Sequence, residues 1–203
     1  EDPALLDEVG NLVERPAAML GSFDPRYLQN LPAEVLISVM KKHQRYFPVI
    51  NADVSLTNHF IVVRNGDQEF AETVVDGNLQ VVHARFADAE FFIREDLERK
   101  LADFVPELEK LTFQKELGSM LAKTRRIQKL SNQLGAKLGL SQADQKTAGR
   151  VAELCKADLA SQMVVEMTSL QGIMGRFYAE KSGEAPEVAQ GIFEHYLPRT
   201  MED

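Results

Sequence analysis

The chain has 203 residues, 44% of them hydrophobic and 27% charged, so it can bury a sizeable core as one large or two small domains. With 31 acidic and 23 basic residues the net charge is −8, which argues against wholesale binding to a polyanion but leaves room for local basic patches. A single cysteine excludes a disulfide framework, and no run approaches the roughly 20 apolar residues of a membrane span. We therefore expect a cytoplasmic protein, and the start EDPALLDEVG, without an initiator Met or a signal-peptide pattern, suggests an excised fragment of a longer chain.

The first 80 residues mix helix and strand signals. PALLDEVGNLVERPAAMLGSFD predicts a short helix that stops at Pro16 and is followed by a loop. LPAEVLISVMKKHQRYFPVI predicts a helix that begins near Pro32 and ends before Pro48. The runs YFPVI, HFIVVRNG and FAETVVDGN are rich in β-branched and aromatic residues and are separated by turn residues, which predicts short antiparallel strands. Residues 1–98 are thus expected to form an α+β domain.

From Leu79 onward the strand signals vanish and apolar residues recur at helical spacing. One helical pattern continues through residues 108–138 to a stop at Gly139, Ser141 can cap the next helix, and Pro186 lies at the start of the last one. We predict an all-helical domain over residues 99–203, so the fold class is α+β, with a mixed N-terminal domain followed by a helical one.

Residues 153–179, ELCKADLASQMVVEMTSLQGIMGRFYA, read as a core helix that carries polar side chains where its apolar stripe should be unbroken. Asp158, Gln162 and Glu166 run down the middle of that stripe at i, i+4 and i+8. A buried acid costs several kcal/mol unless it is paired, metal-bound or protonated. The three residues therefore need a hydrogen-bond or ion-pair partner, or a function that requires them.

Signatures of catalysis and metal binding are missing from the sequence. The four histidines form no HxH, HExxH or HD arrangement, which argues against a metal site. GSMLAK and GNLQVV lack the spacing of a phosphate-binding loop. Cys155 lies on an apolar stripe with no histidine beside it, so we assign it to packing. We predict no catalytic residue, no metal and no cofactor in this chain.

Residues 110–137 form the most basic stretch, with seven basic side chains against one acid. About half of this charge fits a solvated outer face, and helical geometry separates Arg125 from Lys123 by roughly 160°, so the basic side chains cannot all face one strand. We predict phosphate contacts first at Arg126 and Lys129. The candidate nucleic-acid contacts are Lys123, Arg125, Arg126, Lys129, Lys41, Lys42 and Arg45.

Five blocks stand out in a fixed order: LLDEVGNLVERPAAMLGSFDPRYLQNLPAEVLISVMKKHQRYFPV, DGNLQVVHARFADAEFF, TFQKELGSMLAKTRRI, CKADLASQMVVEMTSLQGIMGRFYA and EHYLPR. Together they resemble the beta subunit of the two-chain bacterial glycyl-tRNA synthetases, from Leu5 to Arg199. The resemblance implies that an alpha subunit activates glycine with ATP and Mg²⁺, whereas the beta subunit binds tRNA(Gly) and is needed for charging. It further implies an alpha/beta hetero-oligomer in the cytoplasm, without membrane association, in which this fragment alone is non-catalytic.

The family also implies that the helical domain is related to the HD hydrolases, whose last metal ligand is a helical Asp resembled here by KADL. The chain contains no His-Asp dipeptide, so most metal ligands are lost. We expect Asp158 and Glu166 to persist in a buried polar network, held by basic partners such as Arg150 or Arg176.

Three functions remain open at this point: tRNA recognition, a structural module that docks the alpha subunit without touching RNA, and an HD-type metal phosphohydrolase. The missing ligands disfavour the third. The sequence does not separate the first from the second.

Overall fold

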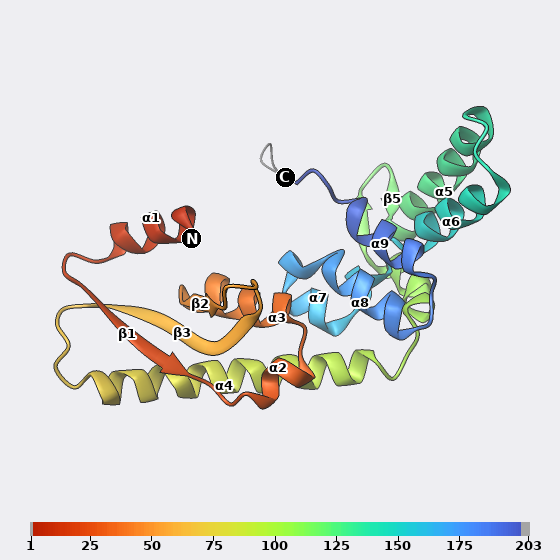
Figure 1. The fold of residues 1–203 in the computed structure, drawn as a ribbon. Coiled ribbons are helices and arrows are strands. Elements are labelled where there is room, and N and C mark those ends of the chain that lie inside the picture. Colours follow the sequence, from red (N-terminus) through yellow and green to blue (C-terminus); the bar gives the residue numbers. More distant parts are fainter. Residues whose placement is uncertain (1, 200–203) are drawn as a thin grey trace. The chain divides into compact units, whose positions relative to one another are not determined.

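The computed structural model describes residues 2–199, which cluster into two compact units that divide after Phe91 (Figure 1). The sequence had placed the boundary after residue 98. Mixed helix and strand structure in the first unit and predominantly helical structure in the second agree with the α+β class.

A three-stranded antiparallel sheet organises the first unit. Its strands are β1 (Pro16–Ser22), β2 (Phe47–Ile50) and β3 (Leu56–Asn65), in the order β1-β3-β2. β1 pairs with β3 along its whole length, and every second residue of β1 is buried, as the two-residue period of a strand requires. One face of the sheet therefore belongs to the core.

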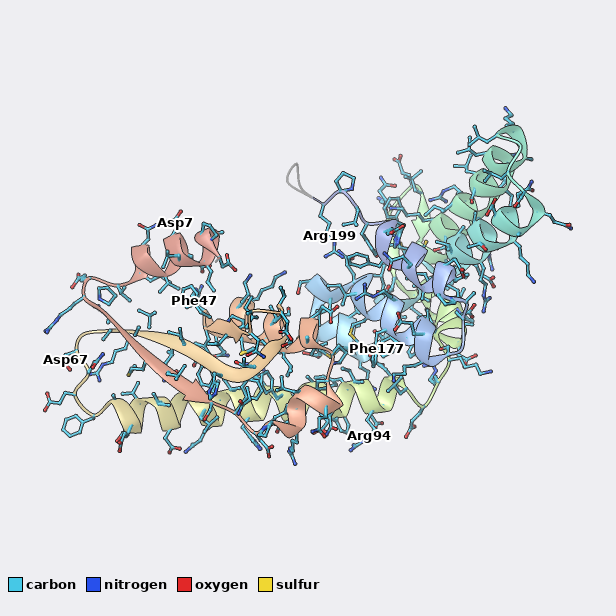
Figure 2. The ribbon with its side chains drawn as sticks, viewed as in Figure 1. Asp7, Phe47, Asp67, Arg94, Phe177 and Arg199 are labelled. Carbon is cyan, nitrogen blue, oxygen red and sulfur yellow. The ribbon has the colours of Figure 1, made fainter. Side chains whose placement is uncertain are left out.

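Helices complete the first unit, and they are α1 (Pro3–Leu12), α2 (Arg26–Asn30), α3 (Ala33–Ser38), the π-helix η1 (Val39–His43) and α4 (Ala71–Asp96). α1 buries Leu5 and Val9, whereas Asp7 points outward into solvent (Figure 2). Phe86 of α4 packs edge to face against Phe23 and Tyr27, with ring centroids 5.0 and 5.2 Å away. These aromatic contacts join α4 to the segment that follows β1.

The second unit is mainly helical, and its elements are η2 (a 3₁₀ helix, Leu101–Lys110), β4 (Thr112–Gln114), β5 (Gly118–Ser119), α5 (Met120–Lys137), α6 (Gln142–Leu154), η3 (3₁₀, Ala157–Ala160), α7 (Gln162–Glu166), η4 (3₁₀, Thr168–Leu170), α8 (Ile173–Lys181) and α9 (Pro186–Glu194). Its core is built from fully buried side chains that include Leu101, Leu154, Met163, Met174 and Ile192.

The predicted helix ends of the second unit are confirmed. Ser141 is the N-cap of α6 and its side chain accepts a hydrogen bond from the Asp144 backbone N–H, at 3.1 Å. Gly139 has a φ of +67° and follows α5 directly after the C-cap residue, a conformation that glycine adopts without strain. Pro186 is the first residue of α9.

Two strand predictions of the first unit are confirmed and two segments were wrong. β2 lies in YFPVI, and β3 begins at Leu56 and continues through most of HFIVVRNG, but FAETVVDGN belongs almost entirely to α4. Asp76-Gly77 resembled a turn, yet α4 continues through it because Val82 and Phe86 bury one face of the helix further along. Residues 16–22, expected to be a loop, form β1; this strand lies at the sheet edge, where Pro16 as first residue is tolerated.

The helical domain is more broken than its periodicity predicted. Residues 112–119 form a small β4–β5 hairpin instead of the helix expected there, with Gly118 at a φ of +82°. Residues 153–179 are not one helix, because η3, α7 and η4 intervene between α6 and α8. Ser161 ends η3 and begins α7 by accepting a hydrogen bond from the Val164 N–H, and this side-chain cap interrupts the helix.

Candidate nucleic-acid interface

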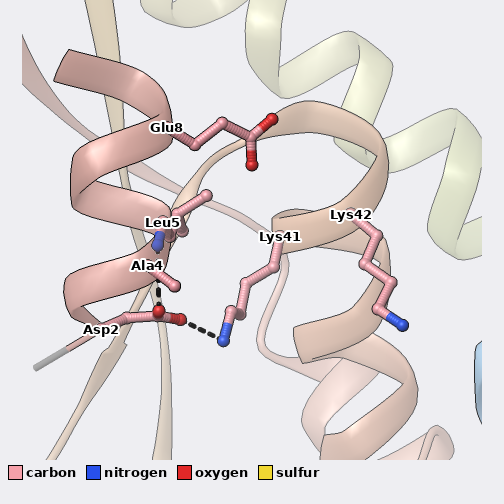
Figure 3. A pocket seen from close by; sticks show the side chains of 6 residues that line it. All are labelled: Asp2, Ala4, Leu5, Glu8, Lys41 and Lys42. Atoms are coloured by element: carbon pink, nitrogen blue, oxygen red, sulfur yellow. Dashed lines mark hydrogen bonds and ion pairs between the residues drawn. The ribbon is translucent and has the colours of Figure 1, made fainter. Parts of the chain in front are cut away.

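The first basic cluster, Lys41, Lys42 and Arg45, adjoins α1. Lys41 forms an ion pair with Asp2, and Arg45 forms one with Glu8 at 2.6 Å, whereas Lys42 extends away from both carboxylates (Figure 3). The hydrogen bond from Lys41 and the one from the Leu5 N–H lower the pKa of Asp2. These pairs hold α1 against η1, through Lys41, and against Arg45, which follows the Gln44 C-cap of η1.

A pocket of ≈ 340 Å³ lies at this junction and is lined by Asp2, Ala4, Leu5, Glu8, Lys41 and Lys42 (Figure 3). Two carboxylates line it together with two ammonium groups. An incoming phosphate would meet the carboxylates as well as the lysines, so the pocket offers no purely cationic surface. Among the three bases, Lys42 makes no ion pair within residues 2–199.

The second basic cluster lies on α5, which carries five basic residues and no acidic one. The Lys123 ammonium lies over the Phe113 ring, 3.8 Å from its centroid, and Arg126 donates to the Leu117 carbonyl at 2.9 Å. Both contacts tie the start of α5 to the β4–β5 hairpin.

Arg125 and Lys129 are exposed and form no ion pair within the described part of the chain. On a helix of 100° per residue, Arg125, Arg126 and Lys129 fall within roughly 100° of arc on the exposed side of α5. The residues opposite them, Thr124 and Gly135, are buried. The structure therefore gathers three of the four predicted bases on one solvent-facing surface, and it engages Lys123 elsewhere.

Asp158 is completely buried in η3. Its Oδ2 atom accepts hydrogen bonds from the backbone N–H groups of Gly172, at 2.6 Å, and Gly175, at 3.1 Å. Both donors belong to the start of α8, where helical N–H groups have no partner within their own helix. Asp158 thus completes the N-terminus of α8 from a distant part of the chain.

Gly175 is required for this contact. A Cβ atom at position 175 would lie 2.9 Å from Oδ2 of Asp158 and 2.7 Å from a methyl carbon of Ile192. Gly172 has a φ of +79°, so its N–H turns toward the carboxylate in a conformation that other residues adopt only with strain. The two glycines let the backbone approach Asp158 closely.

The expected pairing of Asp158 with Arg150 was wrong. Arg150 pairs with Glu184, at 2.5 Å, and with Glu153, at 2.9 Å, and Asp158 is held by backbone amides instead. The line of three polar residues also does not exist, because residues 157–170 are broken into short helices and Gln162 and Glu166 are exposed.

Burial raises the pKa of Asp158 to about 6, against the opposing influence of the two amide donors and of the nearby Lys156. Its second oxygen, Oδ1, has no hydrogen-bond partner within residues 2–199. Lys156 places its ammonium 3.7 Å from the Tyr196 ring centroid, and burial lowers the pKa of Lys156. Burial also lowers the pKa of His195 to about 4, so this imidazole is neutral near pH 7.

Within residues 2–199, no group of three or more His, Cys, Asp or Glu side chains is arranged to hold a metal ion. Cys155 is buried, and burial raises the pKa of its thiol, which leaves it protonated near pH 7. A search of the same residues finds no helix with the length and apolar character of a membrane span.

A family model described as glycyl-tRNA synthetase beta subunit matches residues 1–203, the whole sequence. The chain belongs to the glycyl-tRNA synthetase beta subunit family. It is 50% identical to the glycine–tRNA ligase beta subunit of Picosynechococcus, 51% identical to that of Moorella thermoacetica and 48% identical to that of Halalkalibacterium halodurans, each over 100% of this chain. The chain spans 29% of the length of each of these relatives.

In this member of the beta subunit family a second carboxylate, that of Asp96, is buried, and the sequence did not predict it. Asp96, 2% exposed at the end of α4, accepts hydrogen bonds from the N–H groups of Gln162 and Met163 and from the hydroxyl of Tyr178. It therefore caps α7 from 66 residues away. The acid lies in the charged run REDLERK, which reads as a solvated surface, and nothing in that local pattern distinguishes it from its exposed neighbours.

Proposed function

We propose that this chain is the part of a glycyl-tRNA synthetase beta subunit that contacts tRNA(Gly), supporting glycylation by an alpha subunit that supplies the ATP, Mg²⁺ and glycine sites. The proposal includes a cytoplasmic alpha/beta hetero-oligomer. Family membership and the exposed basic surface of α5 support it.

The observation that carries the proposal is the placement of Arg125, Arg126 and Lys129 on one exposed side of a helix without an acid. In a chain of net charge −8 this concentration of positive charge is locally repulsive. A phosphate backbone would relieve that repulsion and release counterions on binding. Arg126 and Lys129 are the first candidates, and Lys42 is the candidate on the first unit.

The test is the double variant Arg126→Ala with Lys129→Ala in the complete two-subunit enzyme. We expect weaker tRNA binding, a higher KM for tRNA, unchanged glycine-dependent ATP–pyrophosphate exchange, and a slope of log affinity against log salt that falls by about one per lost phosphate contact. A matched control, Arg15→Ala with Arg85→Ala, removes the same charge from exposed positions of the first unit. Charging and salt slopes that stay at wild-type values in the α5 variant would rule out this surface.

Two alternatives give different results. If this part of the chain only docks the alpha subunit, the α5 variant changes subunit assembly and leaves the salt slope intact. An HD-type phosphohydrolase would bind a stoichiometric metal ion, which elemental analysis measures directly. The relationship of the second unit to the HD hydrolases, with its metal ligands lost, stays a prediction, as does the absence of adenylating activity in this chain alone.

A further inference from the structure

Three leucines form an exposed stripe on α5 and its C-cap. Leu130, Leu134 and Leu138 are 62%, 57% and 66% exposed. Their spacing of four residues puts them within roughly 80° of arc, so they line one side of the helix. Leucines scattered singly on a surface are ordinary, but a contiguous apolar row marks a surface that another molecule or segment covers.

The leucine stripe borders an apolar groove. Ile127, on the same side of α5, is part of the lining of a cavity of ≈ 460 Å³ formed with α6 and α9. Leu140, Val151 and Ala152 contribute further apolar walls. The leucine stripe and the groove together provide a row of apolar side chains beside a hollow, the shape that receives one face of an amphipathic helix.

The leucine stripe faces away from two of the three bases proposed to contact tRNA. Lys129 is roughly 140° around the helix from Leu134, and Arg125 is roughly 180° from it, whereas Arg126 is only about 40° from Leu130 and borders the stripe. Aliphatic side chains offer a phosphate backbone neither charge nor hydrogen-bond donors, and nucleic acids are held through such donors. The occupant of this side is therefore a protein segment.

The positive charge of α5 indicates which kind of protein segment would bind beside it. A second copy meeting the stripe in a symmetric pair would bring two helices of five bases and no acids against each other, which is repulsive. A helix with acidic side chains flanking its apolar face would instead be attracted to Arg126 and Lys137, which are exposed and lie roughly 80° and 60° around the helix from Leu134. The relatives are more than three times as long as this chain, so a beta subunit carries several hundred residues outside this part. A segment tethered in the same chain has a high effective concentration at the stripe.

We propose that the leucine stripe and its groove are the docking site for an amphipathic helix with acidic flanks, contributed by the part of the beta subunit outside residues 1–203. Docking there fastens the helical unit to the rest of its own subunit and leaves Arg125 and Lys129 open.

The test places the photo-reactive residue p-benzoylphenylalanine at position 134 of the complete beta subunit, purified without alpha. Irradiation followed by peptide mass spectrometry identifies what covers the stripe. We expect an intramolecular cross-link to a single segment outside this part of the chain. Positions 130 and 138 serve as second probes in case the larger side chain at 134 blocks docking. Position 136 is the matched control, since Ala136 is exposed and roughly 160° around the helix from Leu134, and it should not give that cross-link.

Each other outcome overturns the proposal. Cross-links within residues 1–203 would show that another face of this part of the chain covers the stripe. Cross-links that appear only after addition of alpha would assign the stripe to the other subunit, and cross-links between two beta chains would assign it to a second copy. The absence of cross-links from all three positions would show a stripe open to solvent. A tRNA measurement on Lys129→Ala alone is independent of every one of these results, because Lys129 lies roughly 140° around the helix from Leu134.

Discussion

Replacing Asp158 by Asn isolates the cost of ionising a completely buried carboxyl group. The amide oxygen of Asn can still accept the N–H groups of Gly172 and Gly175, so the geometry at the start of α8 is preserved. The amide NH₂ then takes the place of Oδ1, which has no partner within residues 2–199. That NH₂ donor, like the O–H of the protonated carboxyl group, is buried without a partner, and its cost does not depend on pH.

The carboxyl group behaves differently with pH. Its pKa is about 6 in the folded chain and has an ordinary value near 3.8 in the unfolded chain, so the folded state binds the proton more tightly. Ionisation therefore costs folding free energy once the pH rises above about 4, and the loss is complete above about 6. The whole displacement corresponds to about 3 kcal/mol, of which about 2 kcal/mol falls between pH 4.5 and 7.5.

We expect the stability advantage of the wild-type chain over Asp158→Asn to shrink by about 2 kcal/mol as the pH is raised from 4.5 to 7.5. Urea unfolding followed by far-ultraviolet circular dichroism at four pH values across this range measures the difference. All other titrating groups are shared by the two chains and cancel. A difference in unfolding free energy that is constant with pH would refute the reasoning, because Asp158 would then ionise equally easily in both states.

Three further substitutions test the packing of individual residues. Gly175→Ala should destabilise the second unit by about 1–3 kcal/mol, because the added Cβ meets both Asp158 and Ile192; urea titration would contradict this with an unchanged midpoint. Gly77→Ala is its counterpart, since no atom lies within 4 Å of the added Cβ, and it should raise stability by up to about 1 kcal/mol; a lower melting temperature would count against a continuous α4. Asp96→Ala should cost about 2–3 kcal/mol by removing the cap of α7 and the acceptor of the Tyr178 hydroxyl, and amide exchange at residues 162–163 that remains slow would argue against it.

Local signals in the sequence were sufficient where a residue's own chemistry decides the structure. Ser141, Gly139 and Pro186 each act within one helical turn of their position, and all three lie where the pattern placed them. β3 was recognisable because its run of β-branched residues lies between turn residues. β1 was missed because ProAlaAlaMetLeuGly has little intrinsic strand preference, and its pairing with β3, 37 to 49 residues away, determines its conformation.

The hydrogen-bond partners of Asp158 could not be predicted from the sequence for a related reason. Its partners are backbone N–H groups 14 and 17 residues along the chain, and every residue except proline carries such a group. A search for opposite charge leads to Arg150, which the fold pairs with Glu184. The informative signal was the pair of glycines at 172 and 175, since two glycines so close together permit the backbone to approach a side chain.

Charge counting located the basic segment on α5, and helical geometry put Arg126 and Lys129 first among its bases. The fold separates them, because Lys123 lies over Phe113 and Arg126 reaches the Leu117 carbonyl, whereas Arg125 and Lys129 extend into solvent. The same helix presents its leucines on a side that faces away from Arg125 and Lys129 and that Arg126 borders. One short helix with two exposed and chemically different sides can hold RNA on one and a protein segment on the other, so a variant that impairs only one of the two contacts would show that they are separate.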